Sequence, residues 1–205
     1  MRLPFQLFLI FLLIATFTFL SSCLEWKVTI LKKQFIHRIP NGKKQGEVTI
    51  KIDEFGLQRL TSSVYIYDDN IFAIDNIMKR LQVMTSDGTV ELIIGNVKDL
   101  KEKSVKKSNF KFNYIGNLSV SKKGAMFVQN IVPRSTKKRL ANNVKTMVLS
   151  PSYILVFDKD GQLQYTLGSS GNPDIPFYYI ENLSVDDTGR LFVLTRSFDN
   201  WTIYG

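Results

Sequence analysis

The amino-acid sequence predicts an all-β fold made of repeated groups of strands. The stretch 114–128 recurs at 179–193, with nine of its fifteen positions identical, at an offset of 65 residues. A second stretch, 80–95, recurs at 153–168 at an offset of 73 residues. In each stretch, apolar residues alternate on both sides of a turn that contains glycine. This pattern is typical of two adjacent strands joined by a tight turn.

The shared residues are those that strands and tight turns need. The first pair of stretches shares Leu118/Leu183, Val120/Val185, Gly124/Gly189, Phe127/Phe192 and Val128/Val193. The second pair shares Val83/Val156, Asp87/Asp160, Gly88/Gly161 and Gly95/Gly168. Asp-Gly between alternating apolar strands is the strongest short-range signal for a hairpin. A weaker, earlier copy of the first stretch is Val64–Asp75.

The order of these hairpins predicts about four strands in each repeat. Self-similarity at this scale indicates a solenoid or a propeller, and four strands per unit favour a β-propeller. One blade spans about 62–95, a second spans about 113–168, and a half blade runs from 178 to the end. We therefore expect a partial β-propeller of about 2.5 four-stranded blades. Closed propellers have about four to eight blades, so we expect either a truncated product of a longer reading frame, which we favour, or an open arc.

One segment carries a resemblance to a known family. Residues 154–161 read ILVFDKDG, and a closing strand that ends at Gly168 follows them. This segment resembles the blades of NHL-type and related six-bladed β-propellers, and the resemblance covers about 62–205. It implies the fold but no activity, because propellers carry many unrelated functions.

The N-terminus predicts an export signal and a lipid anchor. Arg2 precedes an uncharged apolar run from Leu7 to Leu20, which has the length of a secretory signal and is short for a membrane span. The tetrapeptide Leu20-Ser21-Ser22-Cys23 resembles the lipobox of bacterial lipoproteins. That resemblance implies removal of residues 1–22 and palmitate-type acylation of Cys23, and several acyl chains hold a protein stably to a bilayer. The alternatives are an ordinary secretory signal and an uncleaved N-terminal helix.

Residues 23–60 are expected to form the anchor and a β-hairpin ahead of the propeller segment, 61–205. Glu25–Arg38 and Glu47–Phe55 each alternate apolar and polar residues, and Asn41-Gly42 lies between them. Asn-Gly flanked by strands predicts a hairpin. In propellers that close into a ring, N-terminal strands often complete the last blade, and the family resemblance implies the same here.

The net charge and the cysteine content indicate which partners and which cellular environment suit this protein. The whole chain has a net charge of +9, and removing residues 1–22 with their single charge, Arg2, leaves +8. This balance favours anionic surfaces, although solubility and a Lys/Asn/Ile-rich composition explain it as well. Cys23 is the only cysteine, which excludes an intramolecular disulfide framework in an exported protein.

Two basic insertions are candidate binding loops, because loops on a rigid scaffold often carry binding function. Lys98–Lys111 joins the first two blades, and Asn130–Ser150 interrupts the second. The polyanion-binding candidates in the second loop are Arg134, Lys137, Lys138, Arg139 and Lys145. A solvated charge run is the alternative reading. Specific nucleic-acid binding is not predicted, because neither loop has a set of stacking aromatic residues.

Enzyme signatures are nearly absent from the sequence. His37 is the only histidine and is interpreted as an ordinary strand residue, so no histidine-based metal or catalytic site is predicted. The carboxylate pairs Asp158/Asp160 and Asp186/Asp187 lie at predicted turns, where aspartate bonds to the local backbone. No cofactor, metal ion or small-molecule substrate is predicted. Phe177 and Tyr178 follow Pro176 in a connector and form a candidate face for a partner.

These observations favour a non-enzymatic binding or scaffolding module, held on the membrane of a bacterial envelope through acylated Cys23. The arrangement resembles spirochaete-type propeller lipoproteins and, less closely, the propeller lipoprotein of the outer-membrane β-barrel assembly machine. That resemblance implies an envelope protein partner and an accessory role in outer-membrane assembly. The alternatives are a surface adhesin that uses the basic loops on polyanions and, third, a propeller-type lyase or hydrolase.

Overall fold

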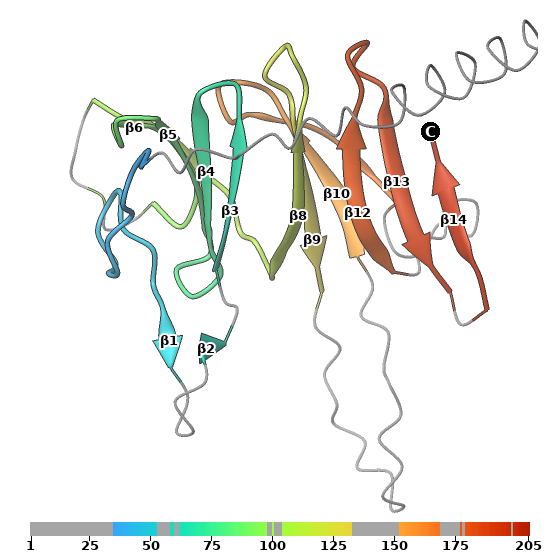
Figure 1. The fold of residues 1–205 in the computed structure, drawn as a ribbon, viewed down its shortest axis with the longest axis horizontal. Coiled ribbons are helices and arrows are strands. Elements are labelled where there is room, and N and C mark those ends of the chain that lie inside the picture. The colour runs from blue at the N-terminus through green and yellow to red at the C-terminus, as the bar shows by residue number, and fades with distance from the viewer. Residues whose placement is uncertain are drawn as a thin grey trace, which may run out of the picture. The chain divides into compact units, whose positions relative to one another are not determined.

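Figure 1 shows the computed structural model of the chain. It describes residues 35–52, 58–59, 62–97, 100, 104–132, 152–168, 177, 179–197 and 199–205. The chain divides into two compact units, 1–35 and 36–205. All the strands belong to the second unit. Fourteen strands in four sheets, with no helix, make up the regular structure of the described residues, so the all-β prediction is confirmed. Across the described part of the chain, no helix has the length and apolarity to cross a bilayer.

Three larger sheets follow one another in chain order (Figure 1). The first contains β3 (Ser62–Tyr67), β4 (Asn70–Asp75), β5 (Arg80–Thr85), β6 (Val90–Gly95) and β7 (Lys106–Asn109). The second contains β8 (Ile115–Val120), β9 (Met126–Ile131), β10 (Ser152–Phe157) and β11 (Leu163–Leu167). The third contains β12 (Ile180–Val185), β13 (Leu191–Arg196) and β14 (Trp201–Tyr204), and β1 (Lys51–Ile52) pairs with β2 (Gln58–Arg59) separately.

Within each larger sheet, strands that are consecutive in sequence pair antiparallel, as hairpin repeats require. The exception is β7, which lies parallel to β6 in the segment 98–111 that we had interpreted as a basic insertion. The groups of strands predicted at 62–95 and 113–168 are therefore confirmed. The third group stops after three strands within the described residues.

Four tight turns share one hydrogen-bond pattern, which explains the repeated glycine. In each, the glycine N–H donates to the carbonyl oxygen three residues earlier, at 2.8–3.0 Å. The glycines are Gly88, Gly124, Gly161 and Gly189, all with positive φ between 78° and 91°. Only glycine adopts this conformation without strain. The Asp-Gly hairpins predicted at 87–88 and 160–161 are confirmed, and a β-bulge accompanies each one.

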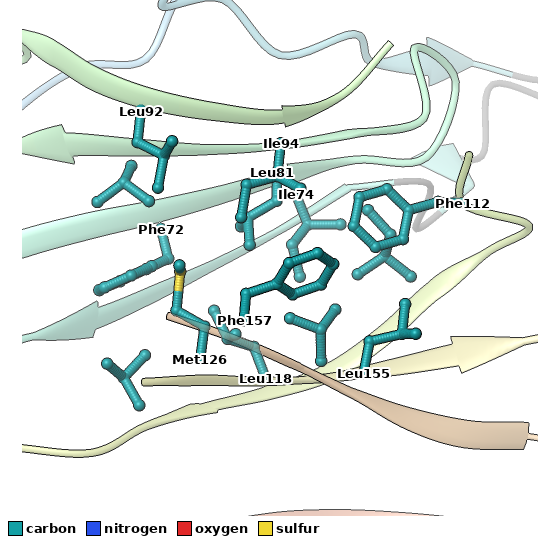
Figure 2. Packing of buried hydrophobic residues seen from close by; sticks show 14 residues of the cluster. Phe72, Ile74, Leu81, Leu92, Ile94, Phe112, Leu118, Met126, Leu155 and Phe157 are labelled. Carbon is teal, nitrogen blue, oxygen red and sulfur yellow. The ribbon is translucent and has the colours of Figure 1, made fainter. Parts of the chain in front are cut away.

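The three larger sheets pack face to face through two apolar clusters. We call the face of a sheet that is turned toward the next sheet in the chain its forward face, and the opposite face its backward face. The forward face of the first sheet and the backward face of the second form the larger cluster (Figure 2). Its buried residues are Phe72, Ile74, Leu81, Val83, Leu92, Ile94, Phe112, Ile115, Leu118, Val120, Met126, Val128, Leu155 and Phe157. The second cluster joins the forward face of the second sheet, with Phe127, to the backward face of the third, with Val193.

The backward face of the first sheet is covered by residues 39–50, here called the cap segment. Val48 packs on Ile71, Ala73 and Met84 of β4 and β5. Three polar side chains of the same sheet face, Asp75, Arg80 and Gln82, are almost fully buried beneath the cap segment. They form hydrogen bonds with its backbone.

Each of these polar groups has partners on the cap segment. The Arg80 guanidinium donates to the carbonyl oxygens of Lys44 at 2.6 Å and Glu47 at 3.0 Å. Gln82 donates to the Glu47 carbonyl at 2.8 Å, and Asp75 accepts the Thr49 N–H at 2.9 Å. Arg80 and Asp75 also lie 4.0 Å apart, and burial lowers the pKa of Arg80 while Asp75 and Glu47 oppose that shift. Buried polar groups with such partners hold a segment in one position.

The described residues around Asn41-Gly42 show no hairpin, but the first of its two predicted strands lies largely outside the described residues and the second contains β1. Residues 35–50 form no strand, and Asn41 makes only an isolated parallel bridge to Val48. The physical reason is that the cap backbone between 44 and 49 bonds to side chains of the first sheet instead of to a second strand. The apolar residues of this stretch alternate because the stretch packs on the face of a sheet, although it is not itself a strand of that sheet.

Candidate functional site

A cleft of about 590 Å³ opens between the turns of the first and second sheets. Strand ends and turns of both sheets line it, since tight turns that join successive strands collect at the same edge. The lining includes Tyr67, Asp68, Asn70, Thr89, Val90, Glu91, Ser104, Lys106, Ser121, Lys122, Gly124, Lys159 and Asp160. Its floor is apolar and consists of Phe72, Val83, Leu92, Val120 and Met126, all members of the larger cluster. Figure 2 shows Phe72, Leu92 and Met126 approaching one another from the two sheets. Cavities of this size accommodate a small molecule or a few residues of a peptide.

The rim of the cleft carries charges of both signs. Its cations are Lys106, Lys122 and Lys159, and its carboxylates are Asp68, Glu91 and Asp160. Lys106 on β7 lies 2.6 Å from Asp160 in the β10–β11 turn. This contact lowers the pKa of Asp160, first through the hydrogen bond and then through the charge of Lys106, and it raises the pKa of Lys106. The ion pair therefore joins the two walls of the cleft.

A second ion pair joins the next two sheets in the same way. Lys122 in the β8–β9 turn lies 2.9 Å from Asp187 in the β12–β13 turn, and the hydrogen bond raises the pKa of Lys122. Both ion pairs are exposed to solvent, so each contributes little stability. Lys159 makes no ion pair with the described part of the chain, which leaves its ammonium available to a ligand at the rim.

The predicted roles of the turn aspartates are confirmed for two of four. Asp158 accepts the N–H groups of Asp160 and Gln162, and Asp186 accepts those of Thr188 and Arg190. The Thr188 hydroxyl also donates to Asp186 and, as the largest cause, lowers its pKa. Asp160 and Asp187 instead form the ion pairs between sheets. Sequence reasoning missed these pairs because their lysines come from other repeats, and no local signal identifies them.

The cleft presents groups that can bind a ligand. No three or more His, Cys, Asp or Glu side chains within them are placed to hold a metal ion. The cleft can bury an apolar group on its floor and pair charges of either sign at its rim. These are the means by which a protein surface recognises a peptide segment.

Most of the site residues predicted from sequence lie outside the described residues. These are the lipobox residues Leu20, Ser21 and Ser22, the acylation site Cys23, the loop cations Arg134, Lys137, Lys138, Arg139 and Lys145, and the aromatic Tyr178. Their roles stay predictions. Phe177 is described and is half-buried in the second cluster, with its ring 5.5 Å from that of Tyr204 in an edge-to-face contact. The Phe177 ring thus packs against other residues of this chain.

His37 does not lie in a strand, which corrects the sequence interpretation. It belongs to the stretch without strands that precedes the cap segment, and its imidazole lies directly over the Gly88 turn. A β-carbon at position 88 would collide with this ring, so glycine is needed there for space as well as for its positive φ. The histidine therefore packs on a turn, and in the described residues it belongs to no group of three or more His, Cys, Asp or Glu side chains that could hold a metal ion.

No model of a known protein family matches this chain, and no curated protein is significantly similar to it. Its function is therefore argued from its own residues.

Proposed function

We propose that this chain is a lipid-anchored, non-enzymatic binding and scaffolding module of the bacterial envelope, and that its sheets are part of a β-propeller. The observation that carries the proposal is the stacking of repeated sheets whose turns meet at a cleft with an apolar floor and a charged rim. A rigid scaffold that presents several turns side by side is suited to binding a protein segment. The resemblance of Leu20-Ser21-Ser22-Cys23 to a lipobox supports the proposed location on a membrane of the bacterial envelope.

The propeller proposal is supported by the repetition within the fold. The four glycine turns share the same hydrogen bonds, and Phe72 and Phe127 are buried at matching forward positions. Sheets of consecutive antiparallel strands, packed face to face in chain order, are the units from which propellers are built. Small-angle scattering of the full chain distinguishes an arc from other arrangements, since an arc has a maximum dimension that a linear stack of the same sheets exceeds.

Acylation tests the anchor directly. Cells that express the full chain are grown with an alkyne analogue of palmitate, and the purified protein is examined for label. We expect label on the wild type and none on Cys23→Ser, because the thiol is the only acceptor of the diacylglyceryl group. An unlabelled wild-type protein would remove the lipoprotein assignment.

The cleft is the proposed site for the protein partner. Lys159→Glu reverses the one rim cation that lacks an ion pair in the described residues, and Lys111→Glu makes the same change at an exposed lysine that does not line the cleft. Both variants are compared with wild type in pull-downs from detergent-solubilised membranes. We expect envelope proteins, including outer-membrane assembly components, to be recovered with wild type and Lys111→Glu and to be depleted with Lys159→Glu. Equal recovery with all three proteins counts against the cleft.

The net charge of the mature chain supports one alternative, an adhesin that binds polyanions through the loop at 130–150. Protease treatment of intact cells separates the two functions. A periplasmic module is cleaved only after the envelope is opened, whereas an adhesin is cleaved on intact cells.

A further inference from the structure

The forward face of the third sheet differs from its counterparts in what covers it. Phe192 matches Phe72 and Phe127 in the repeat, and both of those side chains are buried against a following sheet. Ile203, which lies opposite Leu194 on this face, is 70% exposed, whereas its counterpart Ile154 is fully buried. Trp201 beside it is 60% exposed. In the described residues, this face is therefore apolar and open.

Two arginines distinguish this face from those that pack against another sheet. Arg190 precedes β13 and Arg196 is its last residue, and the repeat places uncharged Ala125 and Ile131 at the same positions of the second sheet. Burying a guanidinium against an apolar sheet costs several kcal/mol unless a partner compensates its charge. Arg196 has such a partner in Glu181, whereas Arg190 makes no ion pair with the described residues, so Arg190 disfavours a further sheet of the same type and favours an anionic occupant.

The arginines lie on the aromatic residues of the face. The guanidinium of Arg196 lies 5.4 Å from the Tyr179 ring centre and 5.6 Å from that of Trp201, and Arg190 lies 5.3 Å from the Phe192 ring centre. Arg196 also pairs with Glu181 at 2.9 Å. Tryptophan, tyrosine and arginine around exposed aliphatic residues are the side chains that settle at the interface between headgroups and acyl chains.

A second copy of the chain is a poorer occupant. Head-to-tail packing would need the backward face of the first sheet, which the cap segment covers over β4 and β5. Packing of two forward faces would bring Arg190 and Arg196 of both copies together, between chains that each carry a net charge of +9.

From this chemistry we propose that the forward face of the third sheet, with Trp201, Ile203, Arg190 and Arg196, docks on an anionic phospholipid surface. This contact deepens the proposed function, since the lipid anchor would hold the chain beside that surface. Trp201 and Ile203 enter the interface, and the two arginines bind phosphate groups of the lipid. The face would then fix the orientation of the domain on the bilayer that Cys23 only tethers.

Tryptophan fluorescence in vesicles tests the docking without acylation. The full chain carries Cys23→Ser and Trp26→Phe, so that Trp201 is its only tryptophan. It is reconstituted into vesicles of phosphatidylcholine, with or without phosphatidylglycerol, that contain brominated phosphatidylcholine as the quencher. A matched control chain carries Trp201→Phe and Tyr165→Trp, because Tyr165 on β11 is 53% exposed and lies away from the face.

We expect quenching and a blue-shifted emission of Trp201 only in vesicles with phosphatidylglycerol, and little quenching of the indole at position 165. Arg190→Ala and Arg196→Gln should each lower the docked-to-free ratio about fivefold, as expected for about 1 kcal/mol per arginine near an anionic surface. About 1 M salt should abolish the docking, because the Debye length falls to about 3 Å.

Three results would overturn the proposal. They are equal quenching in pure phosphatidylcholine, equal quenching at positions 201 and 165, and a dimer in sedimentation equilibrium that Ile203→Asp dissociates. The last would assign the face to a second copy. Because the test chain cannot be acylated, failure here leaves the labelling result at Cys23 standing, and an unlabelled Cys23 leaves this result standing.

Discussion

Among the described residues, the outer faces of the first and third sheets differ in what covers them. At one end, the cap segment covers the backward face of the first sheet with an apolar contact through Val48 and a buried polar network around Arg80. At the other end, the forward face of the third sheet leaves Trp201 and Ile203 exposed in the described residues. A repeat unit has two apolar faces, so each end of a repeat array needs either a cap or a partner. The first sheet is covered by the cap segment of the same chain, whereas the open face of the third sheet carries exposed apolar side chains that a partner could bury.

The largest expected contrast is between two phenylalanines at the same position of the repeat. Phe127 is 6% exposed between the second and third sheets, whereas Phe192 occupies the open face. We expect Phe127→Ala to lower the free energy of unfolding by about 3–5 kcal/mol, because it leaves a cavity in a packed core. Phe192→Ala should cost less, about 1–2 kcal/mol, because the Phe192 side chain is only half-buried. Urea denaturation of the two variants measures both values, and equal losses would show that the third sheet is covered in solution.

The next contrast compares the arginines at the two ends. Arg80→Met removes two hydrogen bonds from a charged donor to part-buried cap carbonyl oxygens, so we expect a loss of about 2–3 kcal/mol. Arg196→Met removes an exposed ion pair with Glu181 and should cost about 1 kcal/mol or less. Hydrogen exchange should accelerate at Val48 and Thr49 in Arg80→Met only. Unchanged protection there would mean that the apolar contact alone holds the cap segment.

A smaller contrast concerns two glycines with the same turn geometry. Gly161 and Gly189 have φ of +78° and +90°, so alanine is strained at both positions and should cost about 1 kcal/mol. A β-carbon at Gly161 would in addition lie 2.9 Å from Leu92 of the first sheet, whereas one at Gly189 meets no atom within 4 Å. We expect Gly161→Ala to be the more destabilising by about 1 kcal/mol or more, since overpacking adds to the strain. Thermal unfolding of the two variants measures the difference.

The sequence was sufficient for the strands, because they depend on local signals. Alternation, Asp-Gly and the duplicated Phe127 and Phe192 segments mark hairpins that form within about fifteen residues of chain. The same local pattern failed around Asn41-Gly42, where side chains from β4 and β5 compete for the backbone. It also missed β7, since a parallel edge strand with the sequence KKSN has no apolar alternation.

The cleft was beyond prediction from the sequence for a related reason. Its rim combines Lys106 of the first sheet with Lys159 and Asp160 of the second, and only the packing of the two sheets brings them together. The sequence predicts the loop cations at 134–145 as binding residues, because a high density of charge is visible in a sequence. The pair of Lys106 on β7 with Asp160, 54 residues later, is not visible in a sequence, because neither residue differs from an ordinary surface side chain until the sheets are stacked.

The smallest expected effect concerns pH and the ion pair at the cleft. The pKa of Asp160 is lowered in the folded chain, first by its hydrogen bond with Lys106. A lowered pKa means that the contribution to stability is present above the unfolded pKa of about 3.9, and is lost as the pH falls through the folded value. We therefore expect Asp160→Asn to unfold at a slightly lower temperature than wild type at pH 7, with the difference shrinking as the pH falls below about 4 and vanishing below the folded pKa of Asp160.

Asp186 provides the control for the measurement on Asp160→Asn. Asp186, in the β12–β13 turn of the third sheet, also has a lowered pKa, but its partners, Thr188 and Arg190, belong to its own turn. Asp186→Asn should show the same dependence on pH without any dependence on salt, since uncharged hydroxyl and N–H donors are not screened. The Asp160→Asn difference should shrink in about 1 M salt, where surface charges lose their attraction. If both differences respond to salt alike, Lys106 and Asp160 do not pair across the cleft in solution, and its two walls are joined by the apolar floor alone.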